Sequence, residues 1–281
     1  MTRRSHGHGG RAWAAGLVLA CLGAAPAVAH GAVAPARVQG RFTMRAVVTT
    51  AVDVRGEHRG ERLHRTWRIR PARCRHDICR VLHLRRTRGH GRILRLTLHR
   101  RPDGSYAGRG AFFVALSCHG RVDRRGALAP YTIRLQVTAT RTVGGIRFAR
   151  RLRATYSNPA RPDRTDCAFG PSHDAARYSG RLRSGLPSPP HAAFVATAGA
   201  GGLVSFRDAS RPGGGPGRRV IAWRWSFGDP RSGAADVASG SAPAHRFTAP
   251  GTYVVTLTAI DHAGLRSTAK QTVVVPAAPA P

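Results

Sequence analysis

The chain has 281 residues, and its 46 lysine and arginine residues against 13 acidic residues give a formal net charge of +33. At about 100–150 residues per domain, this length leaves room for two modest domains rather than one large enzyme core. Hydrophobic residues make up 42% of the chain, which permits buried cores and excludes wholesale disorder. No apolar run after the N-terminal segment approaches the ~20 residues that cross a bilayer, which excludes a polytopic membrane protein.

The first 29 residues have the three-part composition of a secretory signal peptide. Three arginines give a positive start, residues 12–25 are apolar, and small residues at 27–29 suit cleavage before His30. This pattern predicts export to a secreted or cell-surface location. The alternative is a lipoprotein anchored through Cys21, which follows Val18-Leu19-Ala20.

Residues 38–180 have the pattern of a β domain. Apolar residues occupy the odd positions from Tyr131 to Ala139, the period of a strand with one buried face. Shorter runs near Phe42, Leu63 and Leu94 alternate in the same way. Turn signals at residues 88–91, 102–104 and 144–145 separate the runs, and no segment has sustained helical periodicity. We expect about seven antiparallel strands in a meander that forms a barrel or a sandwich.

Four cysteines remain once the leader is removed, an even number that favours two disulfides in an oxidising compartment. Of the three possible pairings we expect Cys74–Cys79, which closes a tight turn, and Cys118–Cys167, which joins distant segments. In the chain-entropy model a bridge closing about 50 residues contributes roughly 4 kcal/mol, more than a short loop does. A zinc site is the alternative, because His76 lies between Cys74 and Cys79, but a fourth ligand and the C-x2-C spacing are missing. We therefore expect no metal and no cofactor.

The positive charge belongs to this first domain. Residues 41–180 hold 31 basic and 9 acidic side chains, a net of +22, whereas residues 191–281 hold 9 and 4, a net of +5. All but one of the 46 basic residues are arginine, a skew that a GC-rich coding sequence would also produce. The charge therefore has two explanations, compositional drift or a face that binds polyanions. The candidate contacts to a polyanion are Arg65, Arg68, Arg70, Arg147, Arg151 and Arg153.

The candidate partners are a cell-surface polysaccharide, another polyanion or a protein. Specific binding of nucleic acid is not expected, because it normally requires aromatic residues on which bases stack. The aromatic residues of this domain occupy apolar-face positions and are expected in the core: Trp67, Tyr106, Phe112, Phe113, Tyr131 and Phe148. The segment from Trp67 to Cys79 resembles a hairpin of uncharacterised secreted actinobacterial proteins, and this resemblance implies no activity.

A linker rich in proline and serine, residues 181–191, is expected to separate the first domain from a second one at 192–276, with a short tail at 277–281. Two segments characterise the second domain. Residues 225–230 read WSFGDP, and residues 245–261 read HRFTAPGTYVVTLTAID. They resemble the PKD (polycystic kidney disease) domain, with its hallmarks W-D-F-G-D-G and H-x-Y/F-x-x-P-G-x-Y-x-V-x-L-x-V-x-D.

The resemblance implies an immunoglobulin-like β-sandwich, so the whole chain is expected to be all-β. The sequence departs from the family at Ser226, where the family usually has Asp, and at Pro230, where it usually has Gly. Alternation in the second segment agrees with a strand, and Trp225 and Phe227 are spaced to point together into a core. The motif residues to which we assign structural roles are Trp225, Phe227, Gly228, Asp229, Pro250, Gly251, Tyr253 and Asp261.

Some PKD domains bind calcium through loop carboxylates, and the resemblance places Asp208, Asp229 and Asp261 in such positions. Because Ca²⁺ takes 6–8 oxygen ligands, we expect these side chains to cap turns instead.

The motif inventory argues against catalysis. The sequence has no H-E-x-x-H, no G-x-S-x-G and no G-x-x-x-x-G-K-[ST] motif. Only two glutamates occur, Glu57 and Glu61, which leaves few options for paired carboxylates. We expect a non-catalytic exported protein, with the PKD-like domain as a spacer or adhesion module and the basic domain in contact with polyanions. The alternative is an accessory carbohydrate-binding protein of a glycan-processing system, for which Trp223 is the candidate aromatic platform.

Overall fold

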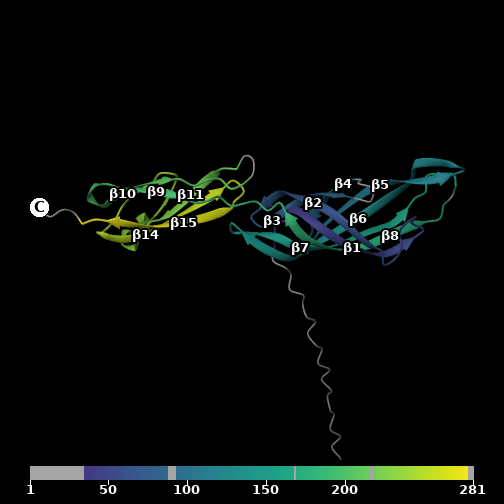
Figure 1. Cartoon of the computed structure of the whole chain (residues 1–281), viewed down its shortest axis with the longest axis horizontal. Coiled ribbons are helices and arrows are strands. Elements are labelled where there is room, and N and C mark those ends of the chain that lie inside the picture. The colour runs from purple at the N-terminus through teal and green to yellow at the C-terminus, as the bar shows by residue number, and fades with distance from the viewer. Residues whose placement is uncertain (1–34, 88–92, 168, 215–217, 278–281) are drawn as a thin grey trace, which may run out of the picture. The chain divides into compact units, whose positions relative to one another are not determined.

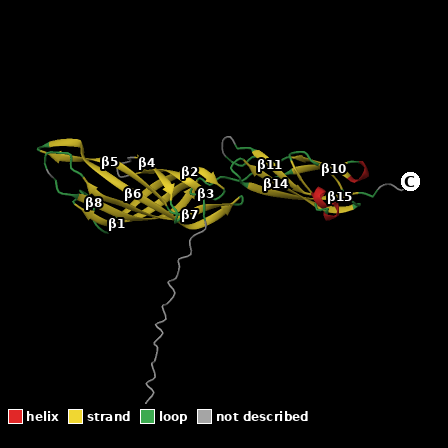
Figure 2. Ribbon diagram, turned by 180° about the vertical axis from the view of Figure 1, so that it is seen from behind, coloured by secondary structure: helices red, strands yellow, loops and turns green. Residues whose placement is uncertain are grey.

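The computed structural model describes residues 35–87, 93–167, 169–214 and 218–277 of the chain. Strands dominate the described part, and its few helical turns are short (Figures 1 and 2). No helix in these ranges is long and apolar enough to cross a membrane. The predicted leader, with Cys21, lies outside the described residues, as does the predicted turn at 88–91.

The first domain is a closed barrel of eight antiparallel strands, in which each strand pairs with the next and the last pairs with the first. The prediction of an antiparallel meander is therefore confirmed, and of its two expected forms, a barrel or a sandwich, the structure has the barrel, with eight strands instead of about seven. The strands are β1 (Gly40–Val52), β2 (Arg62–Arg75), β3 (Ile78–Thr87), β4 (Ile93–Arg100), β5 (Tyr106–Cys118), β6 (Arg121–Val143), β7 (Ile146–Arg161) and β8 (Ser172–Ser184). Because β8 continues to Ser184, residues 181–184 belong to the barrel rather than to the linker.

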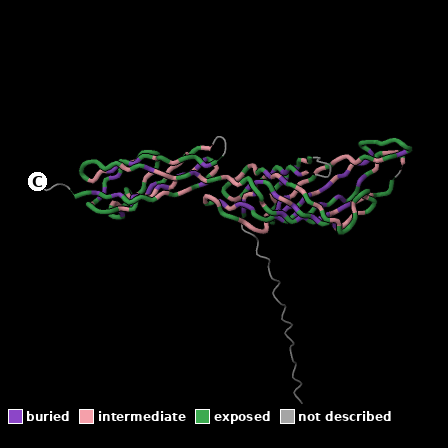
Figure 3. Tube along the Cα trace, viewed as in Figure 1, coloured by how far each residue is buried: buried purple, intermediate pink, exposed green. Residues whose placement is uncertain are grey.

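Alternation along each strand builds the core of the barrel, because successive side chains point to opposite faces. The inner positions carry large apolar side chains, and the outer positions are mostly exposed (Figure 3). The largest fully buried side chains inside are Trp67, Phe42, Met44, Ile69, Leu82, Leu84, Leu98, Ile133, Leu135 and Leu152. The interior is thus a packed core.

The aromatic residues of the barrel follow the prediction with one exception. Trp67, Tyr106, Tyr131 and Phe148 are buried, and Phe112 packs against the core. Phe113 has the opposite parity to Phe112, and Arg125 lies over its ring, with the guanidinium carbon 4.2 Å from the ring centroid. Phe113 therefore belongs to the outer face.

Turns and disulfides connect the strands as the sequence predicts. Gly144 and Gly145 have φ values of 55° and 78° and link β6 to β7, where Val143 pairs with Ile146. Both predicted disulfides are present: Cys74–Cys79 closes the β2–β3 hairpin, and Cys118–Cys167 ties the end of β5 to the β7–β8 loop.

The ladder between β4 and β5 is short. Among the described residues, β4 and β5 pair only through His99 with Ala107 and Arg100 with Tyr106. Beyond these pairs Gly108 lies so close to β4 that a Cβ atom placed on it would sit 2.2 Å from the backbone oxygen of Thr97. The absence of a side chain at this position lets the two strands approach each other.

The second domain is a sandwich of two antiparallel sheets, in the orders β13-β10-β9 and β12-β11-β14-β15. Its core lies between the sheets and contains Phe194, Phe206, Trp225, Phe227, Val255 and Leu257. The strands are β9 (Phe194–Ala198), β10 (Leu203–Asp208), β11 (Val220–Ser226), β12 (Val237–Ser239), β13 (Ala244–Arg246), β14 (Gly251–Asp261) and β15 (Arg266–Val275). Two short 3-10 turns, η2 (Ala200–Gly202) and η3 (Pro230–Asp236), connect them.

Candidate functional site

Four arginines form a row across the outer face of the barrel. In the register of β1 to β4, Arg41 pairs with Arg68, Arg68 with Arg85, and Arg85 with Arg95. Since neighbouring strands are about 4.8 Å apart, the row extends over roughly 14 Å, perpendicular to the strands. We refer to Arg41, Arg68, Arg85 and Arg95 as the arginine row.

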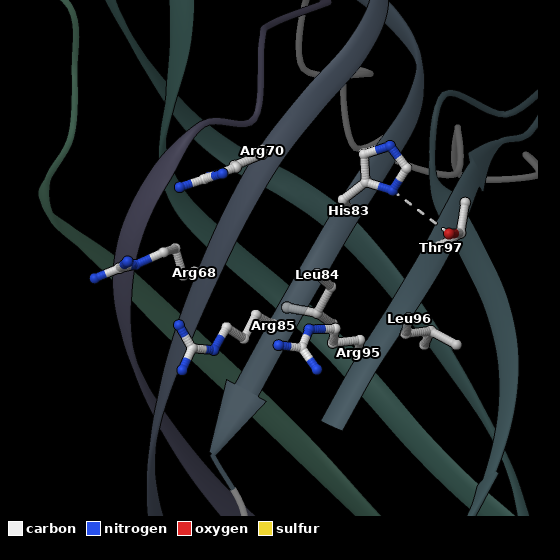
Figure 4. Close-up of a pocket in the computed structure, with 8 residues that line it drawn as sticks. All are labelled: Arg68, Arg70, His83, Leu84, Arg85, Arg95, Leu96 and Thr97. Carbon is white, nitrogen blue, oxygen red and sulfur yellow. Dashed lines mark hydrogen bonds between the residues drawn. The ribbon is translucent and has the colours of Figure 1, made fainter. Parts of the chain in front are cut away.

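Three members of the arginine row line a groove of about 500 Å³ on the barrel. Figure 4 shows these side chains on adjacent strands, together with His83, whose ring nitrogen lies 3.5 Å from the hydroxyl of Thr97. The groove is lined by Arg68, Arg70, His83, Leu84, Arg85, Arg95, Leu96 and Thr97. None of these lining residues is acidic, so the groove attracts anions.

No member of the arginine row has an acidic partner among the described residues. This it shares with most arginines of the described part, since ion pairs are formed there by Arg134, Arg147, Arg161 and Arg218. The row is distinguished by its register, which places four arginines side by side on adjacent strands. Like charges directly opposite each other on neighbouring strands destabilise a sheet. An anion bound in the groove would relieve this repulsion.

The six arginines predicted to contact a polyanion lie in different surroundings. Arg68 and Arg70 line the groove, and Arg151 and Arg153 are exposed on β7. Arg147 is already engaged within the protein, because its side chain and backbone N–H both bind Asp77, at 3.1 and 2.8 Å.

The prediction of an outward position is wrong for Arg65. Its parity on β2 is that of Trp67 and Ile69, so it points into the barrel and lines a small cavity with Tyr178. Sequence reasoning missed Arg41, Arg85 and Arg95. Alternation with leucines marks Arg85 and Arg95 as outward-facing, but only the strand register shows that they lie beside Arg68.

In the second domain the motif residues have structural roles. Trp225 and Phe227 are buried, as predicted, and the indole N–H of Trp225 donates to the backbone oxygen of Gly240 at 2.8 Å. Gly228 has φ = 73°, and a Cβ there would lie 2.7 Å from the backbone oxygen of Val254. After Pro250 and Gly251 turn the chain into β14, the hydroxyl of Tyr253 donates to the backbone oxygen of Ala249 at 2.7 Å.

Asp229 is 1% exposed and accepts hydrogen bonds from a segment 16 to 19 residues away. One of its oxygens accepts from the backbone N–H of Thr248 at 2.9 Å and lies 3.2 Å from Nε2 of His245; the other accepts from the hydroxyl of Thr248 at 2.8 Å. Burial alone would raise the pKa of Asp229, but these hydrogen bonds outweigh it and hold the pKa below its usual value. The carboxylate therefore joins two distant segments, a larger role than the local turn cap that the sequence predicts.

The other two motif carboxylates cap turns locally. Asp261 accepts from the backbone N–H groups of Ala263 and Leu265, each at 2.9 Å. Asp208 accepts from the backbone N–H of Ser210 at 3.0 Å. Asp208, Asp229 and Asp261 belong to no cluster of three or more potential metal ligands in the described ranges.

One group of potential metal ligands occurs in the barrel, where the side chains of Cys118, His119, Asp166 and Cys167 lie within 4.8 Å of one another. The two cysteines are joined as a disulfide, so they offer no thiolates. His119 and Asp166 alone are too few to hold a zinc ion.

Trp223 does not form an exposed platform for a sugar ring. It is half-buried and packs against the sandwich core, on the inward parity of Trp225. The carbohydrate-binding alternative thereby loses its best residue.

A family model described as PKD domain matches residues 188–275, close to the expected 192–276. This segment thus matches the PKD domain family, and its two antiparallel sheets form the β-sandwich that the resemblance implied. The match to the PKD family does not extend to the barrel. For the barrel, the resemblance to uncharacterised actinobacterial proteins stays a prediction.

Two solved structures are similar to part of the chain. The PKD1 domain of Vibrio anguillarum Epp is 26% identical, over 33% of this chain and 100% of that domain, with a TM-score of 0.28. The PKD1 domain of the Vibrio cholerae metalloprotease PrtV is 27% identical, over 32% of this chain and 99% of that domain, with a TM-score of 0.27. No curated protein matches the chain.

Proposed function

We propose that this is a non-catalytic exported protein whose barrel binds an acidic polysaccharide through the arginine row, while the PKD domain serves as a spacer or adhesion module. The observation that carries the proposal is the row itself: four guanidinium groups on adjacent strands, none ion-paired within the described part of the chain. Export is supported by the leader-like composition of residues 1–29 and by two disulfides.

The absence of Phe, Tyr and Trp from the described lining of the groove favours a polysaccharide over a nucleic acid. Binding of single-stranded nucleic acid normally combines cationic side chains with aromatic residues on which bases stack. The lining of the groove contributes arginine, histidine, leucine and threonine only. Such a surface binds the negatively charged groups of a ligand and is poorly suited to stacking with nucleobases.

Retention on immobilised alginate across a sodium chloride gradient tests the proposal. We expect the triple variant Arg68→Gln/Arg85→Gln/Arg95→Gln to elute at clearly lower salt than the natural protein, because three unpaired cations are removed from one groove. The matched control is Arg207→Gln/Arg224→Gln/Arg231→Gln, which removes the same charge from exposed positions of the PKD domain. This control is expected to elute close to the natural protein.

Equal elution of the two triple variants would contradict a specific role for the arginine row and would leave only a general effect of net charge. Stronger retention on single-stranded DNA than on alginate at equal salt would contradict the choice of polysaccharide.

A further inference from the structure

Polar and charged side chains occupy the inner positions at one end of the barrel, where the alternation predicts apolar ones. On β3 the inward residues are Leu82, Leu84 and then Arg86. On β8, read toward the same end, Tyr178 and Ala176 are followed by Asp174. This end of the core is therefore built from ionisable groups.

Arg86 is the central residue of this polar end. It is only 6% exposed, and its guanidinium carbon lies 4.8 Å and 5.0 Å from the ring centroids of Tyr131 and Tyr156. Its Nε–H has no hydrogen-bond partner among the described residues. A buried donor without a partner is unfavourable, and a ligand that accepts a hydrogen bond from it would remove this cost.

A cavity of about 30 Å³ opens beside Arg86. It is lined by Val48, Glu57, Leu63, Arg65, Arg86, Thr87, Tyr156, Asp174, Ala175, Ala176 and Tyr178. Its volume corresponds to roughly one water molecule in the liquid, so it accepts the head of a ligand rather than a whole sugar or nucleotide.

Charged groups of both signs surround the cavity. Arg65 and Arg86 bring two guanidinium groups to its lining, together with the carboxylates of Glu57 and Asp174. Asp174 is engaged by Arg161 at 2.5 Å, and both side chains are buried. Burial raises the pKa of Tyr178, so its hydroxyl stays protonated and is able to donate a hydrogen bond.

We propose that this end of the barrel is a binding site for the carboxylate group of a small organic acid, with the guanidinium of Arg86 and the hydroxyl of Tyr178 as its donors. A planar guanidinium matches a carboxylate through parallel hydrogen bonds, and the flat carboxylate fits the small volume better than a tetrahedral phosphate does. The site lies inside the barrel and is separate from the arginine row, which faces outward.

Side-chain NMR of the full, oxidised protein tests this site with acetate as the probe. The Nε–Hε resonance of Arg86 is identified by its loss in Arg86→Lys. We expect sodium acetate to shift this resonance saturably, whereas sodium chloride at equal ionic strength does not. The resonance of Arg95, on the outer face, is expected to change equally little with both salts.

Three variants sharpen the test. Arg86→Lys keeps the charge but loses the fork of donors, and we expect at least a tenfold weaker affinity, read from the shifts of neighbouring backbone amides. Tyr178→Phe removes one hydroxyl with little change of shape, and a severalfold weaker affinity is expected. Arg95→Gln is the control that leaves acetate binding unchanged, which also separates this proposal from the polysaccharide proposal.

Three results would overturn the proposal: a shift of Arg86 that grows in proportion to salt without saturating, full affinity in Arg86→Lys, or phosphate binding at least as tight as acetate binding. If Arg86→Lys does not fold, unaltered acetate affinity in Tyr178→Phe contradicts the proposal on its own.

Discussion

Asp229 is the single side chain on which the geometry of the PKD motif most depends. It satisfies the backbone N–H and hydroxyl of Thr248 and contacts His245, whose ring stacks on Phe227 with centroids 4.3 Å apart. Removing one partner of such a buried set leaves the others desolvated and unpaired. The family motif therefore specifies an aspartate here for its bonds across the fold.

The replacement Asp229→Asn is expected to lower the free energy of unfolding of the PKD domain by about 3 kcal/mol at neutral pH. Because the pKa of Asp229 is held below that of an unfolded aspartate, its contribution is complete above about pH 4 and is lost as the pH falls through the folded-state pKa. The difference between the two proteins should thus shrink as the pH falls below about 4. The difference in the free energy of unfolding is measured by urea denaturation, monitored through hydrogen exchange of the Trp225 indole N–H.

The control for this prediction is Asp208→Asn, because the carboxylate of Asp208 accepts a local hydrogen bond from the backbone N–H of Ser210, two residues away. A difference between natural protein and Asp229→Asn that stays constant across this pH range would contradict the proposed role of the ionised carboxylate.

At the scale of elements, the arginine row opposes the stability of the barrel. Arg85 has an arginine directly opposite on each side, Arg68 on β2 and Arg95 on β4. Cross-strand pairs contribute about 0.2–1 kcal/mol, and like charges reverse the sign. The arginine row therefore lowers the stability of the sheet.

We expect Arg85→Gln to raise the free energy of unfolding of the barrel by about 0.5 kcal/mol in low salt. The gain should vanish toward 1 M sodium chloride, because salt screens exposed charges. Thermal unfolding at several salt concentrations tests this, with Arg109→Gln, an exposed arginine on β5 that pairs with Thr132, as the control. Equal gains in both variants would show that net charge, rather than the row, sets the effect.

The close approach of Gly108 on β5 to β4 gives a second prediction at this scale. A methyl group at Gly108 would meet the backbone oxygen of Thr97 at 2.2 Å, and backbone atoms yield little. Gly108→Ala should destabilise the barrel by about 2–3 kcal/mol, the upper range for overpacking. Chemical denaturation checks this value, and Gly170→Ala, where a Cβ has open space and φ is not positive, should have little effect.

The strands of the barrel could be predicted from sequence because alternation fixes which residues share a face. Tyr131 to Ala139 and the leucines near Leu96 illustrate this, since one period defines both strand and core. The arginine row could not be predicted, because it depends on the register between strands far apart in sequence. Alternation assigns Arg65 and Arg86 to the inner face, with Trp67 and Leu84, but it does not show which side chains of other strands they meet there.

At the scale of the whole molecule, the two disulfides differ in the length of chain that they close. Their partners are 49 residues apart in Cys118–Cys167 and 5 apart in Cys74–Cys79. In the chain-entropy model the longer loop contributes about 4 kcal/mol and the shorter about 2 kcal/mol. We expect Cys118→Ser/Cys167→Ser to destabilise the barrel more than Cys74→Ser/Cys79→Ser.

Urea denaturation of both double variants, without reductant, measures the two contributions. Equal losses, or a larger loss for the hairpin disulfide, would show that local strain rather than loop length determines the stabilisation.

The pairing of β1 with β8 has a consequence for how the protein is made. The ladder joins residues near 44 to residues near 180, so no barrel exists until the last strand has been synthesised. Contacts between such distant parts of a chain form slowly. During that interval we expect the arginines of the earlier strands to keep the unfinished sheet from pairing with other chains, because like charges repel. The charge that lowers the stability of the finished barrel would then reduce the aggregation of its precursor.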